Sequence, residues 1–202
     1  MSPNNPSPSL PSRGSPADPA GAFGPHLIGG RVVLAEYDPK WPYLYQHESD
    51  RIREHLGEEV LELAHVGSTA VPGLVAKPCV DVLLLVADSA DEDAYRPRLE
   101  KAGYTLYVRE PDWHEHRVFK RPDVNVNLHV FSRGSSEPER MLLFRDRLRA
   151  DEGDRALYAR TKRALAKRRW DRTQDYADAK SEVVEQIIAR ARSAAGSGQS
   201  AV

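Results

Sequence analysis

Two apolar runs joined by a turn constrain the fold of this chain more than any other feature. Residues 60–66 (VLELAHV) and 80–86 (VDVLLLV) are predicted strands, and Gly67-Ser68 breaks the chain directly after the first. The second run carries one charge, Asp81, at its start. Backbone N–H groups at a Gly-Ser turn can hold phosphate oxygens, while a carboxylate holds the cation that neutralises them. The pattern therefore suggests a phosphate site, although an ordinary turn explains Gly67-Ser68 about equally well.

Composition predicts one folded domain between two tails. Residues 1–29 are rich in Pro and Ser and predict a disordered tail, residues 30–192 form the expected domain, and residues 193–202 predict a second disordered tail. The net charge of −1 gives no general preference for nucleic acid or an anionic membrane. No apolar run approaches the roughly 20 residues of a membrane helix, and no export signal is visible, so we expect a cytoplasmic protein. The single cysteine, Cys79, excludes an intramolecular disulfide.

Hydrophobic spacing predicts an α+β fold. Along residues 124–131, apolar side chains alternate with Asn125, Asn127, His129 and Phe131, which indicates a strand with one core face and one more polar face. Strands mixed with helices, followed by helices alone, predict a small mixed sheet covered by packed helices and a C-terminal helical pair. The other expected strands are residues 32–35, 60–66, 80–86, 105–109 and 117–121, and the expected helices are residues 42–56, 88–103, 137–169 with a break near Gly153, and 175–192.

Several polar patterns have a plain and a functional explanation. His114 and His116 are spaced to share a strand face, and His129 and Asp81 are possible further metal ligands, but a solvated loop is the commoner outcome. His65 either packs beside its strand or orients a phosphate.

The C-terminal helices carry the one strongly basic segment of the chain. Paired charges on a solvated face are the usual explanation. Lys162 and Lys180 each follow a tyrosine by four residues, Tyr158 and Tyr176, and are the candidates to turn inward toward a polyphosphate. Interleaved acids make nucleic acid an unlikely partner, although a scaffold that contacts RNA or a protein remains a third, weaker hypothesis.

Taken together, the motifs resemble the GrpB family, a branch of the nucleotidyltransferase superfamily. The similar segments span nearly the whole expected domain; they are residues 37–42 (YDPKWP), 65–78 (HVGSTAVPGLVAKP) with Asp81, 127–131 (NLHVF), 144–149 (FRDRLR) and 176–180 (YADAK). The resemblance implies a polymerase-β-like fold with a small mixed sheet. In active members of that superfamily a Gly-Ser pair contacts nucleotide phosphates and two carboxylates, two residues apart, bind divalent metal. Here Asp81 occupies the first carboxylate position and Leu83 the second.

The resemblance implies a nucleotidyltransferase that moves a nucleoside monophosphate from a nucleoside triphosphate to a small acceptor with Mg²⁺. Asp81 would bind the metal, and Asn127 or His129 would complete its coordination or position the acceptor. The residues expected to bind the nucleotide are Gly67, Ser68, Thr69, Lys77, Arg117, Lys162 and Lys180. Because Leu83 replaces a carboxylate, a catalytically degenerate module that binds a nucleotide or another small ligand is the alternative.

Overall fold

The computed structural model describes residues 27–198 of the chain, which form a mixed α+β structure. The strands are β1 (Leu27–Ile28), β2 (Arg31–Val32), β3 (Glu62–Val66), β4 (Val80–Val86), β5 (Thr105–Glu110), β6 (His116–Arg121) and β7 (Val124–Ser132). The helices are α1 (Trp41–Leu56), α2 (Glu92–Lys101), α3 (Ser136–Ala150), α4 (Glu152–Ala166), α5 (Thr173–Asp178) and α6 (Ser181–Gly198), and two 3₁₀ turns are η1 (Gly57–Glu59) and η2 (Ser68–Ala70).

Five strands form one mixed sheet in the order β3-β4-β7-β6-β5, in which only the central β4–β7 pair is parallel. The register places Asp81 of β4 beside Val66 of β3 and beside Asn127 of β7. Asn127 in turn lies beside Lys120 of β6. Paired residues point to the same face of a sheet, so one face gathers these polar side chains. The predicted alternation of β7 is confirmed, since Val126, Leu128 and Val130 are buried in the core.

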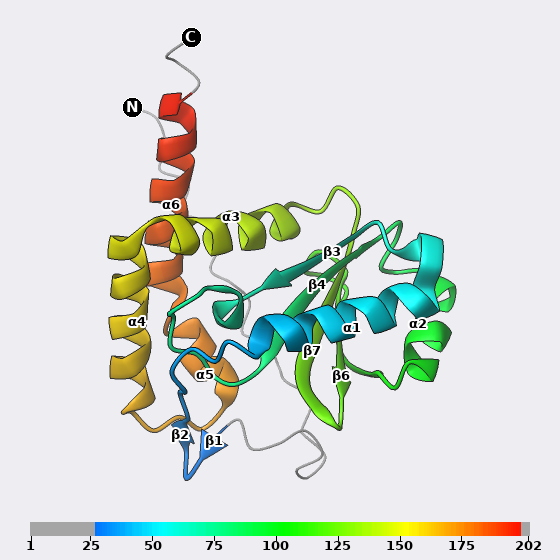
Figure 1. The fold of residues 1–202 in the computed structure, drawn as a ribbon, viewed down its shortest axis with the longest axis horizontal. Helices are drawn as coiled ribbons and strands as arrows, with labels where there is room; N and C mark the ends of the chain where they lie inside the picture. The colour runs from blue at the N-terminus through cyan, green and yellow to red at the C-terminus, as the bar shows by residue number, and fades with distance from the viewer. Residues whose placement is uncertain (1–26, 199–202) are drawn as a thin grey trace.

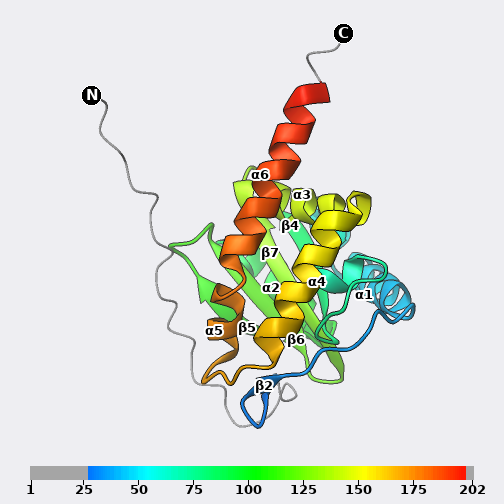
Figure 2. The same ribbon diagram turned by 90° about the vertical axis from the view of Figure 1, so that its left-hand side faces the viewer.

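The opposite face of the sheet holds the main core. Ile52 and Leu56 of α1 and Tyr95 and Leu99 of α2 pack there against the apolar side chains of β4, β6 and β7. Figure 1 shows α1 crossing in front of the sheet, and Figure 2 shows α4, α5 and α6 grouped at one end of it. The polar face therefore meets the C-terminal helices, while the apolar face meets the first two helices.

Local chemistry explains most helix boundaries, and it also explains where the expected boundaries differ. Gly57, with φ 56°, ends α1 as predicted. The Asp151 side chain accepts the N–H of Asp154 at 2.8 Å and so starts α4 just before Gly153. The second helix begins at Glu92 rather than residue 88, because Asp88 accepts the Ala90 N–H in a turn.

The C-terminal segment differs more from expectation. The single helix predicted for residues 175–192 is two helices, α5 and α6, that meet near Lys180. Residues 193–198, expected in the C-terminal tail, continue α6, and residues 27 and 28, expected in the N-terminal tail, form β1. Gly29 lies in the turn between β1 and β2, and the other residues of the two predicted tails, 1–26 and 199–202, lie outside the described residues. Of the first predicted strand, residues 32–35, only Val32 lies in a strand, at the end of β2, although Ala35 forms an isolated bridge with Ala76. None of the helices within residues 27–198 has the length and apolarity needed to cross a bilayer.

Candidate functional site

The Gly-Ser turn and Asp81 are in direct contact. Gly67 has φ 70° and ψ −170°, a backbone conformation that is essentially reserved for glycine. A Cβ atom at Gly67 would overlap Oδ2 of Asp81 and would lie 3.1 Å from the Asp81 Cβ. The absence of a side chain at residue 67 therefore lets the turn pack on the carboxylate.

Asp81, Asn127 and His129 meet as the sequence predicted. The Asn127 side-chain amide donates to Oδ1 of Asp81 at 2.8 Å, and Nε2 of His129 lies 3.5 Å from the same oxygen. Burial opposes ionisation of Asp81, but the hydrogen bonds and charge of His129, together with Asn127 and Lys77, outweigh it and lower the Asp81 pKa. The Asp81 side chain remains 27% exposed, so a ligand can reach it.

A chain of polar contacts continues outward from His129. Nδ1 of His129 lies 3.1 Å from Nε2 of His116, and Nδ1 of His116 lies 2.7 Å from Oε2 of Glu110. The two imidazole rings are stacked, with centroids 5.2 Å apart. His114, the other half of the predicted pair, is not part of this chain, because its Nδ1 lies 3.2 Å from Oγ of Ser135. Glu110 was not predicted as a site residue, because only the folded structure places it beside His116.

Lys162 of α4 reaches the Gly-Ser turn from the other side. Its Nζ donates to Oγ of Ser68 at 3.0 Å and to the carbonyl oxygen of Val75, and it lies 4.7 Å from the Tyr158 ring centroid. Only 2% of Lys162 is exposed, and no carboxylate among the described residues forms an ion pair with it. Burial, reinforced by Lys180 and Arg163, lowers the Lys162 pKa to about 6.

Lys180 and Lys77 add two further amines near Asp81. Lys162 and Tyr158 share a face of α4 as predicted, whereas Lys180 lies in the turn between α5 and α6 and still places its amine 4.6 Å from the Tyr176 ring centroid. Burial lowers the pKa of Lys180 to about 8, although Asp81 opposes the shift. Burial and the charge of Lys180 lower the pKa of Lys77 as well. The structure thus brings three predicted lysines around one carboxylate; we call this group, with Gly67, Ser68, Asn127 and His129, the Asp81 site.

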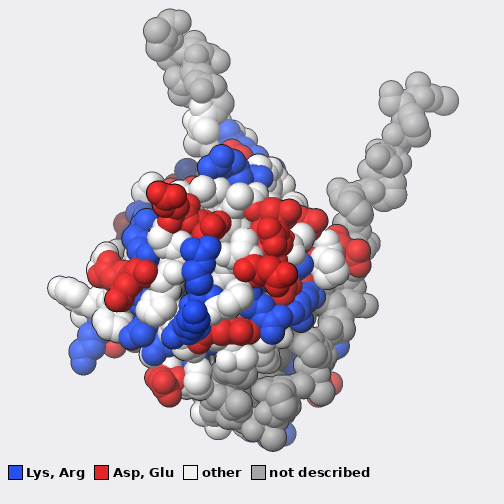
Figure 3. Space-filling model, turned by 90° about the vertical axis from the view of Figure 1, so that its right-hand side faces the viewer, with Lys and Arg blue, Asp and Glu red and all other residues white. Residues whose placement is uncertain are grey.

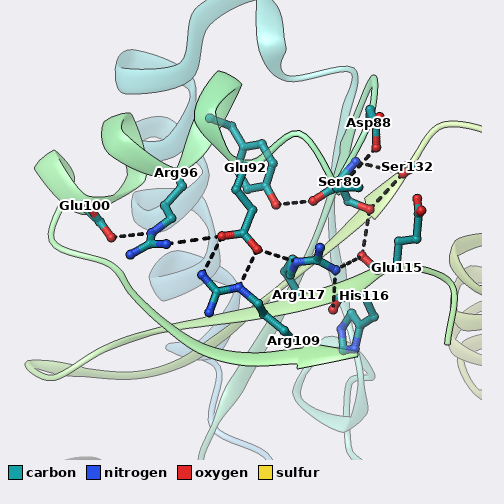
Figure 4. A network of polar contacts seen from close by, with 12 residues as sticks. Asp88, Ser89, Glu92, Arg96, Glu100, Arg109, Glu115, His116, Arg117 and Ser132 are labelled. Carbon is teal, nitrogen blue, oxygen red and sulfur yellow. Dashed lines mark hydrogen bonds and ion pairs between the residues drawn. The ribbon is translucent and has the colours of Figure 1, made fainter. Parts of the chain in front are cut away.

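Two of the predicted nucleotide-binding side chains lie elsewhere. Thr69 follows Ser68 in η2 but turns the other way, where its hydroxyl contacts Nε2 of His65 at 3.0 Å. Arg117 projects from the opposite face of β6, and its Nε donates to Glu92 of α2 at 2.8 Å. Figure 4 shows Arg117 and Arg109 meeting Glu92 between the sheet and α2. Arg117 therefore stabilises the packing of α2, and the sequence assignment of this side chain to the nucleotide site does not agree with the structure.

Lys120, which the sequence analysis did not select, lies on the polar face. It pairs in register with Asn127, is 7% exposed, and places its amine 3.8 Å from the Tyr107 ring centroid. The signal that would have found it is its position one residue after Phe119: Phe119 belongs to the core, so its neighbour must face the other way.

The donor set does not suit Mg²⁺. Leu83, at the expected second carboxylate position, packs with Ala64, Val66 and Phe131 under α3. Oδ1 of Asp81 already accepts from Asn127, and the nearby amines repel a cation. Within residues 27–198 no three His, Cys, Asp or Glu side chains are arranged to hold a metal ion. Mg²⁺ prefers several oxygen ligands, whereas this site offers one carboxylate.

Known proteins resemble this chain in sequence and in fold. The family model described as GrpB protein matches residues 31–190. The chain belongs to the GrpB family. A UPF0157 protein of Halalkalibacterium halodurans is 58% identical over 171 residues, covering 85% of this chain and 87% of the relative.

Two further similarities are informative. A dephospho-CoA kinase of Mycolicibacterium paratuberculosis is 32% identical over 164 residues, but the match covers 68% of this chain and only 40% of that protein. The crystal structure of conserved protein GrpB from Enterococcus faecalis matches this GrpB chain with a TM-score of 0.70 at 28% identity, covering 79% of this chain and 96% of the other.

Proposed function

We propose that the Asp81 site binds the phosphate groups of a nucleotide. One observation carries the proposal: Lys162 is almost completely buried beside Ser68 and has no ion-pair partner among the described residues. A buried ammonium is costly unless an anion accompanies it, so a bound phosphate would supply the missing counter-charge. Lys180 and Lys77 place two more amines within electrostatic range.

The same arrangement should make phosphate binding depend on pH. A phosphate next to Lys162 favours the charged amine, so binding raises the Lys162 pKa from about 6 and takes up a proton near pH 7. Lysines rather than a metal ion would balance the phosphate charge in this proposal. The name of the relative called dephospho-CoA kinase supports a nucleotide-like ligand. A cytoplasmic location and a nucleotidyltransferase-type fold are parts of the same proposal.

Calorimetric titration tests the binding proposal. ATP, AMP and adenosine are titrated into the protein with EDTA and, separately, with Mg²⁺, in buffers of different ionisation enthalpy that report proton uptake. We expect ATP to bind with EDTA present, adenosine to bind at least tenfold more weakly, and Lys162→Met to lose the difference between them. Lys167→Met, at an exposed lysine of the same segment, is the matched control. Equal affinities of ATP and adenosine would refute the proposal.

Nucleotidyl transfer is a second candidate, favoured by the polar chain from His129 to Glu110 beside the amines. An acceptor hydroxyl would attack the α-phosphorus of a nucleoside triphosphate, the bond to the β-phosphate would break, and pyrophosphate would leave. The neutral form of His129 would take the hydroxyl proton at its unprotonated ring nitrogen, and Asp81, 3.5 Å from the ring, would stabilise the resulting imidazolium.

Pyrophosphate release with a panel of small alcohols tests this step. Asp81→Asn and His129→Gln should abolish the release, while Arg117→Gln, on the opposite sheet face, should retain it. ATP binding without any pyrophosphate release across the panel would leave the binding function and reject the transferase.

A further inference from the structure

A second site lies on the other side of the same turn. A cavity of about 590 Å³ opens between the first turns of α1, the η2 turn and the junction of α3 with α4. Two prolines and an alanine line it together with Tyr37, Tyr45, Gln46, His65, Arg149 and Arg155. Its volume falls within the range of small-molecule sites.

The lining of this cavity is positively charged. It contains two guanidinium groups and no carboxylate among the described residues. Arg149 is anchored through Nε, which donates to the carbonyl oxygen of Ala70 at 2.9 Å. Arg155 is anchored through Nη1, which donates to the last carbonyls of α3 at 3.1 Å. Asp146 lies 3.6 Å from Arg149, but its two carboxylate oxygens accept hydrogen bonds from Arg145 at 2.7 and 2.9 Å. The excess positive charge favours an anionic occupant.

Flat rings form the opposite part of the lining. The Tyr45 and His65 rings are stacked, with centroids 4.9 Å apart and planes 8° apart. Burial lowers the His65 pKa to about 4, so the imidazole adds no charge at neutral pH and presents an apolar plane. Tyr37 contributes a second phenol ring, held edge-on against Trp41. Aromatic walls of this kind favour a planar ligand, because offset stacking adds to apolar burial.

The η2 turn separates this cavity from the Asp81 site. Ser68 points to Lys162, whereas Thr69, the next residue, points to His65 in the cavity wall. Each site therefore contacts a different side chain of one short turn.

We infer that the cavity lined by Tyr45, Arg149 and Arg155 binds a small planar aromatic anion, through bidentate contacts of the guanidinium groups and stacking on the tyrosine. Guanidinium forks suit both carboxylate and phosphate groups, so both kinds of anion belong to this ligand class. The inference does not depend on nucleotide binding at the Asp81 site.

Saturation-transfer NMR with matched charged and neutral probes tests the inference. Nicotinate is compared with nicotinamide, and phenyl phosphate with phenol. We expect at least one anion to bind at least tenfold more tightly than its neutral partner, and Arg155→Gln to weaken that anion at least tenfold, as expected for loss of a charge-assisted hydrogen bond. Arg163→Gln, which removes an exposed α4 arginine paired with Glu36 outside the cavity, should leave affinity unchanged.

A second pair of variants tests the inference without altering the arginines, in case Arg155→Gln misfolds. Gln46 lies at the exposed edge of the cavity and its amide donates only to the exposed Asp50 at 2.8 Å, so Gln46→Glu and Gln46→Lys should both stay folded, with stabilities that differ by no more than a surface i,i+4 pair contributes. Gln46→Glu should weaken the anion and Gln46→Lys should strengthen it, while Lys162→Met should have no effect. Equal binding of charged and neutral probes, or identical affinities of the two Gln46 variants, would overturn the inference. Loss of anion binding in Lys162→Met would assign the anion to the Asp81 site instead.

Discussion

Replacing Lys162 with methionine should make the protein without ligand more stable. At pH 7 the ordinary lysine pKa of 10.5 lies about 3.5 pH units higher, whereas the folded-state pKa is about 6. At about 1.4 kcal/mol per pH unit, folding a chain in which Lys162 must lose its proton costs up to about 5 kcal/mol. Methionine removes this cost but also removes the hydrogen bonds to Ser68 and Val75, which together contribute about 2 to 3 kcal/mol. The expected net gain at pH 7 is about 2 kcal/mol.

The pH dependence of the free energy of unfolding tests the sign of the Lys162 contribution independently. Between about pH 6 and pH 10.5 the unfolded chain binds more protons at Lys162 than the folded chain does, so wild-type stability should rise with pH across this window. Lys162→Met should lose the part of that rise that Lys162 contributes, while the lowered pKa values of Lys180 and Lys77 leave a smaller rise in place. Urea denaturation in phosphate-free buffer, repeated from pH 6 to pH 10, measures both curves, and Lys167→Met should follow the wild type.

Two results would refute the reasoning about Lys162. One is a constant stability difference between wild type and Lys162→Met at every pH, because the advantage of the variant must fall as pH rises and must reverse once the deprotonation cost of Lys162 drops below the contribution of its hydrogen bonds. The other is destabilisation by Lys162→Met at pH 7 larger than the hydrogen bonds account for, which would show that the amine already has a counter-charge in the folded protein.

Three further predictions concern the turn and the opposite sheet face. Gly67→Ala should lower the free energy of unfolding, measured by urea denaturation, by more than about 2 kcal/mol, because the new Cβ would overlap Asp81. Gly73→Ala is the control: its Cβ would meet nothing within 4 Å, so it should lose only the energy of its backbone strain. Equal losses in the two variants would contradict the contact between residue 67 and Asp81. Arg117→Gln should lower stability by about 2 to 4 kcal/mol without changing ATP affinity in calorimetry, because it leaves Glu92 without one of its partners. Neighbouring arginines, first among them Arg109, hold the Glu92 pKa at about 2, so protonation of Glu92 should remove this stabilisation as pH falls from about 4.5 through 2. The stability of Glu92→Gln should therefore depend less on pH in this range. An acid profile identical to that of the wild type would contradict the role of Glu92.

Period-two and apolar patterns were sufficient to predict the five strands of the main sheet, while the family resemblance selected the residues of the Asp81 site. Asp81, Asn127 and His129 meet because parallel pairing of β4 with β7 places Asp81 beside the polar face that the alternation of β7 had indicated. Lys162 and Lys180 were found through their spacing from tyrosines, since residues four apart share a helix face.

The errors have equally specific causes. Arg117 lies two residues before Phe119, so the alternation of β6 places both side chains on the core face, and Arg117 cannot reach the Asp81 site on the other face. Thr69 was misplaced because successive residues of a tight 3₁₀ turn point in directions about 120° apart, which no sequence period reports. Glu110 and the cavity beside His65 depend on distant segments that meet only in the folded chain.

The end of the molecule away from the basic C-terminal helices carries charges of both signs, so the RNA-scaffold hypothesis is confined to those helices. Figure 3 shows acidic and basic side chains interspersed on the end of the molecule opposite α4 and α5. Such a surface gives no continuous basic path for a phosphate backbone. A salt-independent affinity for RNA would exclude the nucleic-acid form of that hypothesis.

The parallel pairing at the centre of the sheet has a consequence for how the protein matures. Asp81 and Asn127 are 46 residues apart in the chain, and Ser68 and Lys162 are 94 apart. Contacts at such separations form slowly, because the intervening segment must close into a loop first. The sheet and the first two helices can therefore assemble while the Asp81 site still lacks the amines of Lys162 and Lys180. Competence to bind an anion there would mark the last stage of folding, and a ligand present at that stage would favour the docking of the C-terminal helices.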